Sequence, residues 1–76
     1  MDAKNALKYI VKQAIKRGNG VDGIMREAQK IASLARLAGK RLAMDDKALA
    51  WWAVLIATGE STEEQFLTEY GRKEAK

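Results

Sequence analysis

Four lysines recur at a spacing of four residues near the start of this 76-residue chain. They are Lys4, Lys8, Lys12 and Lys16, and Arg17 follows the last of them. On an α-helix of about 3.6 residues per turn, this spacing places the lysines along one gently twisting ridge. No carboxylate interrupts the series. Clustered lysine and arginine side chains neutralise phosphate groups and release counterions, so the ridge predicts contact with a polyanion.

The positive charge is confined to the first half of the chain. Residues 1–41 contain ten basic and three acidic residues (+7), and residues 42–76 contain four basic and seven acidic residues (−3), which together give the overall +4. This asymmetry favours interaction with nucleic acid. The candidate phosphate-binding residues are Lys8, Lys12, Lys16, Arg17, Arg26, Lys30, Lys40 and Arg41. The alternative interpretation is that they only solvate the surface, or face the acidic C-terminal helix of the same chain.

The residue types that carry most enzymatic chemistry are missing. The chain has no His and no Cys, which removes the commonest general base, the thiolate nucleophile and the usual zinc ligands. The adjacent carboxylates at Asp45–Asp46 and Glu63–Glu64 point about 100° apart on a helix, so neither pair converges on one ion or substrate. We therefore expect no catalytic residue, no metal site and no cofactor, and a protein that is not an enzyme.

Two adjacent tryptophans, Trp51 and Trp52, form the second distinctive feature of the sequence. Neighbours on a helix face different directions, so both can be buried only if the helix is covered on two sides. Either both are core anchors, or one of them lies with Leu55 in an interface with a protein partner. The surrounding segment is apolar almost all round, so this helix is expected to be either buried centrally or shared with a partner.

The elements that must position these residues are helices. The chain has no Pro and is rich in strong helix formers such as Ala, Leu, Lys and Glu. Glycines follow or interrupt the apolar periodicity at Gly18–Gly20, Gly39, Gly59 and Gly71, which predicts helix ends there. The prediction is an all-α, compact bundle of four short helices at about 3–17, 23–38, 46–58 and 62–70, with a single domain over 1–71 and a flexible tail over 72–76.

Capping residues refine the expected starts of three helices. Asp22 is predicted to cap the second helix, and the third is expected to start after Asp45 or Asp46. Ser61 with Glu64 three residues later is the capping-box pattern for the fourth.

Two classes of function fit these features. The first is a small basic accessory or regulatory protein that binds nucleic acid through electrostatic phosphate contacts, with a homodimer through the third helix as its assembly. The alternative is a non-enzymatic protein-binding module, an inhibitor or adaptor that docks on a larger host complex, of a kind common in phages and mobile elements. A helix-turn-helix is disfavoured because the third helix is too apolar to lie in a DNA groove.

A membrane partner is not expected from the sequence. The longest apolar run, Ala48–Ala57, is much shorter than the roughly 20 residues that span a bilayer. The first residues lack the apolar core of a signal peptide. We therefore expect a cytoplasmic protein.

Overall fold

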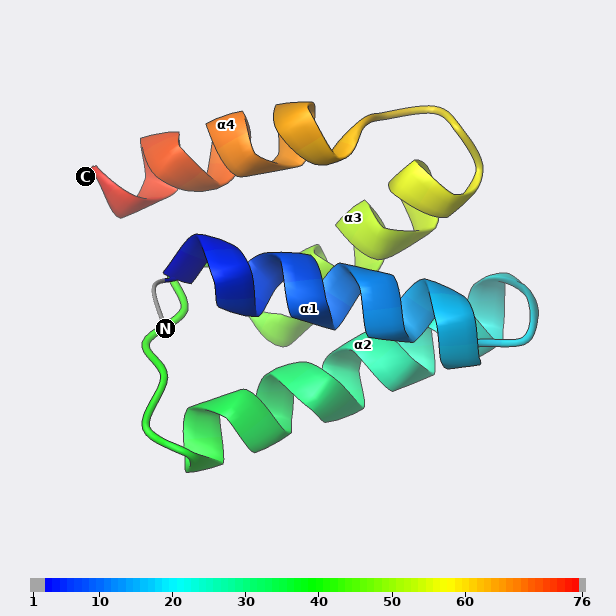
Figure 1. The fold of residues 1–76 in the computed structure, drawn as a ribbon, viewed down its shortest axis with the longest axis horizontal. Coiled ribbons are helices and arrows are strands. Elements are labelled where there is room, and N and C mark those ends of the chain that lie inside the picture. The colour runs from blue at the N-terminus through cyan, green and yellow to red at the C-terminus, as the bar shows by residue number, and fades with distance from the viewer. Residues whose placement is uncertain (1–2, 76) are drawn as a thin grey trace.

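The computed structural model describes residues 3–75, which form four helices joined by three connections (Figure 1). No strand occurs in this range, so the predicted all-α bundle is confirmed. In Figure 1, α1 runs between α4 and α2 while α3 crosses behind, and α1 and α2 form an antiparallel hairpin. The helices are α1 (Ala3–Arg17), α2 (Gly20–Leu37), α3 (Asp46–Ala57) and α4 (Glu63–Glu74).

The bounds of α1 and α3 agree with the sequence-based prediction. The α3 helix begins at Asp46, and the side chain of the preceding Asp45 accepts a hydrogen bond of 2.7 Å from the Ala48 amide. This is the N-cap contact that satisfies one of the free amides of a first helical turn. Although α3 is the most apolar of the four helices, no helix within residues 3–75 combines the length and apolarity needed to cross a bilayer.

The α2 helix begins earlier than predicted, at Gly20 instead of residue 23. Asn19 holds the N-cap position without a side-chain cap hydrogen bond. The predicted cap, Asp22, lies inside the first turn, where its negative charge complements the helix dipole. The prediction failed because Gly20 was assigned to the loop between the two helices, whereas it is the first residue of α2.

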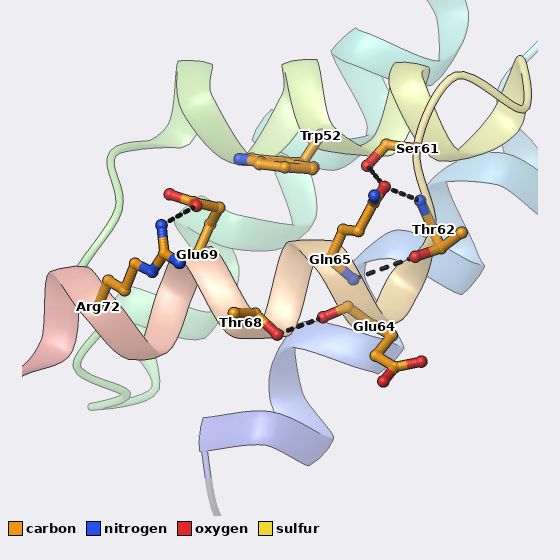
Figure 2. Close-up of a pocket in the computed structure, with 8 residues that line it drawn as sticks. All are labelled: Trp52, Ser61, Thr62, Glu64, Gln65, Thr68, Glu69 and Arg72. Atoms are coloured by element: carbon orange, nitrogen blue, oxygen red, sulfur yellow. Dashed lines mark hydrogen bonds and ion pairs between the residues drawn. The ribbon is translucent and has the colours of Figure 1, made fainter.

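The α4 helix begins one residue later than the predicted capping box implies (Figure 2). Thr62 is the N-cap, and its hydroxyl accepts a hydrogen bond of 3.1 Å from the Gln65 amide. The Gln65 side-chain oxygen accepts in return from the Thr62 amide at 3.1 Å and from the Ser61 hydroxyl at 2.8 Å. The box is therefore formed by Thr62 and Gln65, and the prediction of Ser61 with Glu64 was wrong by one residue.

The α4 helix also continues past its predicted end. It runs through Gly71 to Glu74, so the segment assigned to a tail is helical as far as Glu74, while Lys76 lies outside the described residues. A glycine inside a helix costs only about 1 kcal/mol relative to alanine. Arg72 and Lys73 lie in the last turn, where cations interact favourably with the helix dipole.

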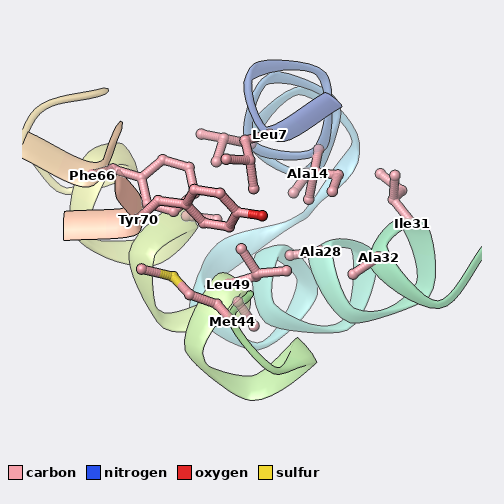
Figure 3. Close-up of a cluster of buried hydrophobic side chains, with 13 residues drawn as sticks. Leu7, Ala14, Ala28, Ile31, Ala32, Met44, Leu49, Phe66 and Tyr70 are labelled. Atoms are coloured by element: carbon pink, nitrogen blue, oxygen red, sulfur yellow. The ribbon is translucent and has the colours of Figure 1, made fainter. Parts of the chain in front are cut away.

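The core is made of small and mid-sized apolar side chains from α1, α2 and α3, closed on one side by α4 (Figure 3). Ala28, Ala32 and Ala53 have no accessible surface. Because alanine ends at Cβ, these positions let the helices pack close together. The core cluster comprises Leu7, Ile10, Val11, Ala14, Ala28, Ile31, Ala32, Met44, Leu49, Ala50, Ala53, Phe66 and Tyr70.

Two aromatic residues one turn apart attach α4 to this core. Phe66 is fully buried, and its ring centroid lies 5.6 Å from that of Trp52 on α3 in a tilted arrangement. The Tyr70 ring is buried, and its hydroxyl accepts a hydrogen bond of 2.9 Å from the Ala43 amide. The large aromatic side chains on the apolar face of α4 are therefore buried in contacts within the chain.

One arginine makes most of the side-chain hydrogen bonds that join the connection between α2 and α3 to the end of α2. The Arg36 guanidinium donates hydrogen bonds to the carbonyls of Leu42 and Met44 and to the Asp46 carboxylate. Ser33 donates to the other carboxylate oxygen of Asp46 at 2.8 Å. These contacts hold an irregular segment against the end of α2 and set where α3 begins.

Close backbone approach requires a glycine at the turn between α1 and α2. A Cβ at Gly18 would lie 2.5 Å from the Cα of Ile24 and 2.7 Å from the carbonyl oxygen of Ala14. No side chain fits at these distances. Gly18 therefore lets the first turn of α2 pack directly on the end of α1.

Candidate nucleic-acid interface

The α1 helix presents its lysines on the side opposite the core. Its apolar face is buried, so residues spaced four apart on the other side face solvent. Lys12, Lys16 and Arg17 are exposed, and Lys8 is half-buried. The ridge predicted from the spacing is therefore present on the surface of α1.

The α2 helix adds two cations to the same hairpin. Arg26 and Lys30 lie one turn apart and are exposed, whereas Ala28 and Ala32 between and beyond them are fully buried. The α1 and α2 helices pack directly against each other, so these side chains belong to the same hairpin as the lysines of α1. We call the following residues the hairpin cations: Lys12, Lys16, Arg17, Arg26 and Lys30.

The hairpin cations have no ionic partner among the described residues. Within residues 3–75, the side-chain ion pairs join Arg36 to Asp46 and Arg72 to Glu69. Like charges at a spacing of four residues repel each other and slightly oppose helix formation. Binding of an anion would reduce this repulsion between the exposed cations.

The acidic helix α4 lies beside only the N-terminal half of the lysine ridge. A shallow hollow between α1 and α4 is lined by Lys4 and Lys8 on one side and by Glu63 and Glu64 on the other. Lys12 and Lys16 do not line it. The sequence left open whether α4 would neutralise the ridge, and the structure places its carboxylates next to the first half alone.

Two carboxylates stand near the arginines at the closed end of the hairpin. A hollow of about 280 Å³ around the turn is lined by Arg17 and Arg26 together with Asp22 and Glu27. These carboxylates reduce the positive potential at the turn without forming an ion pair there. The strongest positive potential is therefore expected at Lys12, Lys16 and Lys30, which do not line this hollow.

Lys40 and Arg41 lie apart from the hairpin cations. Both follow α2, at the open end of the hairpin, and Lys40 is half-buried while Arg41 is exposed. The α1 helix has 15 residues, so at a rise of about 1.5 Å per residue the two ends of the hairpin are about 20 Å apart. The structure does not gather all eight predicted residues into one cluster.

The tryptophan pair is split between the core and the surface. Trp52 is half-buried against Phe66, whereas Trp51 is 53% exposed. Leu55, one turn after Trp51, is half-buried. The α3 helix is thus covered on the Trp52 side and left uncovered by the described residues on the Trp51 side, and the predicted interface and homodimer stay predictions.

Several surface features were missed at the sequence level. Tyr9, Leu34 and Leu37 are 53%, 56% and 85% exposed, respectively, although all three are large and largely apolar. The exposure of the two leucines could have been recognised from the sequence, because neither lies on the apolar stripe of α2 formed by Ala28, Ile31 and Ala32. The sequence also did not show that the Arg36 guanidinium is used inside the fold, where it bonds to the connection between α2 and α3 and to Asp46.

A hollow of about 640 Å³ lies between α3 and α4 (Figure 2). The Trp52 ring covers one side of it. Its polar side chains mostly bond to one another or to their own helix, as Arg72 does to Glu69 at 2.9 Å and Thr68 to the Glu64 carbonyl at 3.0 Å. Across residues 3–75 no three carboxylates gather as metal ligands. The hollow therefore presents little free chemistry to a ligand.

Comparison of the chain with protein-family models, curated proteins and solved structures finds no match.

Proposed function

We propose that the α1–α2 hairpin binds nucleic acid by electrostatic contact with phosphates, and that the protein acts without catalysis as an accessory or regulatory factor. The observation that carries the proposal is the set of five exposed hairpin cations without an ionic partner among the described residues. Phosphate contacts of this kind supply affinity that does not depend on base sequence.

The chemistry of the surface favours backbone contact over base reading. Among the exposed aromatic side chains, only Tyr9 lies on the same hairpin, so stacking on several unpaired bases has little support. The most apolar helix, α3, supplies the core and presents no basic face, so it is unsuited to a groove. The remaining mode of binding is contact between the lysine and arginine side chains and the phosphate backbone of the nucleic acid.

The test is binding of a fluorescent DNA duplex and of a single-stranded RNA, followed by anisotropy as the salt concentration is raised. If all five hairpin cations contact phosphates, log K should fall with log salt with a slope of about −4.5 for the duplex, at about −0.9 per contact. An affinity that does not change with salt would contradict the proposal.

A pair of double variants makes the test specific to the hairpin. Replacing Lys12 and Lys16 with Gln should reduce the slope by about 2 and weaken binding at low salt. The control replaces Lys47 and Lys73 with Gln, since both are exposed lysines outside the hairpin. Equal losses in the two double variants would show that net charge alone drives binding.

A protein-binding module is the second candidate function. It is favoured by exposed apolar side chains beside the cations, Tyr9 and Leu34 among them. Phosphate binding does not explain these residues.

A further inference from the structure

A groove runs between α1 and α2 and opens to solvent. Its volume is about 350 Å³, and its lining comes from the two helices and from the connection that follows α2. Apolar side chains of small or medium size form most of the lining, including Ala6 and Ile10 of α1 and Ile31 and Ala35 of α2. The surface of the groove is therefore mainly apolar.

Two large side chains line this groove and are more than half exposed. Tyr9 on α1 and Leu34 on α2 are 53% and 56% exposed. Single exposed apolar residues are common on protein surfaces, but two that share one apolar groove mark an interaction site. Burying a leucine of this kind in a partner contributes about 1.5–3 kcal/mol.

A cation stands at each end of the groove. Arg17 is the last residue of α1, and Lys40 follows the end of α2, so in the antiparallel hairpin they lie at opposite ends. Neither side chain forms an ion pair with a described residue. The groove therefore has an apolar middle and one cationic side chain at each end, an arrangement that complements a ligand with an apolar middle and a carboxylate near each end.

We propose that this groove docks an acidic amphipathic helix of a partner protein. From Ala6 to Arg17 the lining extends over 11 residues of α1, which corresponds to about 16 Å or three helical turns. A concave groove of this length accepts the ridge of apolar side chains that a helix presents at every third or fourth residue. The guest helix would carry carboxylates about three turns apart, opposite Arg17 and Lys40.

Charge and shape disfavour the other occupants. A second copy docked hairpin to hairpin would bring the hairpin cations of both copies together, which is repulsive. A phosphate backbone has no apolar ridge to fill the groove beside Ile31 and Ala35. An acidic helix satisfies both the apolar lining and the terminal cations.

The probe is a synthetic, end-blocked peptide of about 16 residues, with leucines at helical spacing on one face and a glutamate near each end of that face. A control peptide has the same composition with the leucines distributed around the helix. A second control has glutamine in place of both glutamates. Binding is measured by anisotropy of a dye on the peptide, and sedimentation of the chain alone reports self-association.

Two leucine variants make a matched pair. Leu34→Asn changes an exposed residue inside the groove, and Leu37→Asn changes an exposed residue outside it. We expect Leu34→Asn to weaken binding of the acidic peptide at least about tenfold, and Leu37→Asn to change it less than about twofold. Because neither variant alters charge, both should bind the DNA duplex as the unchanged chain does, so this inference and the proposed function can fail separately.

A charge variant completes the design. Arg17→Gln combined with Lys40→Gln should weaken binding of the glutamate peptide several-fold and leave the weaker binding of the glutamine peptide unchanged. Three results would overturn the inference: no saturable binding of the acidic peptide, equal losses for Leu34→Asn and Leu37→Asn, or a dimer of the chain that Leu34→Asn abolishes. Circular dichroism of each variant checks that the helices are retained.

Discussion

The Arg36 guanidinium lies 2.8 Å from the Asp46 carboxylate and joins the end of α2 to the start of α3. The same guanidinium also donates to the carbonyls of Leu42 and Met44. One side chain thus satisfies carbonyl groups of a segment that has no regular structure, and a planar guanidinium with several donors suits that role.

Replacing Arg36 with Ala should lower the free energy of unfolding by about 1–2 kcal/mol. The reason is the loss of charge-assisted hydrogen bonds to two carbonyls and one carboxylate, reduced by the partial exposure of the pair. Urea unfolding followed by circular dichroism measures it. The control is Arg72→Ala, whose pair with Glu69 is more exposed and should be worth less than about 0.5 kcal/mol. Equal effects of the two changes would contradict the bracing role of Arg36.

The stability that Asp46 contributes should disappear in acid. The hydrogen bond from Arg36, joined by one from Ser33, lowers the pKa of Asp46 below its ordinary value of 3.8, although desolvation opposes the shift. The folded state therefore binds this proton more weakly than the unfolded state does. The contribution is complete above pH 3.8 and is lost as the pH falls through the lowered pKa.

Asp46→Asn is the variant that isolates this effect. The difference in unfolding free energy between the unchanged chain and Asp46→Asn should be constant at about pH 5–7 and shrink below pH 3.8. Urea unfolding of both proteins over that range measures it. A difference that grows on acidification would show that the carboxylate is not held in its charged form.

Alanine should have opposite effects at two glycines. At Gly18 a Cβ would lie 2.5 Å from backbone atoms of Ile24, so Gly18→Ala should destabilise the hairpin by roughly 1–3 kcal/mol. At Gly71, inside α4, nothing lies within 4 Å of a Cβ, so Gly71→Ala should stabilise by about 0.5–1 kcal/mol. Thermal unfolding separates the two signs. Stabilisation by Gly18→Ala would mean that the two helices are not in close contact at the turn.

The two tryptophans should differ in fluorescence. Trp51 is 53% exposed, whereas Trp52 packs on the buried ring of Phe66. Trp52→Phe should leave a red-shifted emission that acrylamide quenches readily, and Trp51→Phe should leave a blue-shifted emission that it quenches poorly. Similar quenching in both variants would place Trp51 in an interface, as a homodimer through α3 requires, and sedimentation would then confirm or exclude the dimer.

Local sequence signals were sufficient for most of the fold. Gly39 and Gly59 follow α2 and α3 with φ values of 92° and 82°, and this left-handed conformation is what a glycine at a helix end provides. Asp45 capped α3 as its type predicts. Errors arose where two candidates were equivalent in sequence, as for Ser61 and Thr62, or where a glycine taken as a helix end lies inside the helix, as Gly71 does.

The surface was harder to predict than the helices. Periodicity correctly put Lys12 and Lys16 outside the core, because helical spacing alone decides it. It could not show that α4 lies beside Lys4 and Lys8, or that Arg36 turns back to the connection, because both depend on how non-neighbouring helices pack. The α1–α2 groove could not be predicted either, because its lining comes from residues of both helices and depends on how they pack.

The hydrogen bond from the Ala43 amide to the Tyr70 hydroxyl makes one exchangeable proton a reporter of the last helix. Ala43 is exposed and belongs to no helix, so its amide would exchange rapidly with solvent deuterium if this bond were absent. Its protection lasts only while the ring of Tyr70 remains in the core. The exchange rate of this single amide therefore sets an upper limit on how often α4 separates from the other three helices, because movement of the connection alone also breaks the bond.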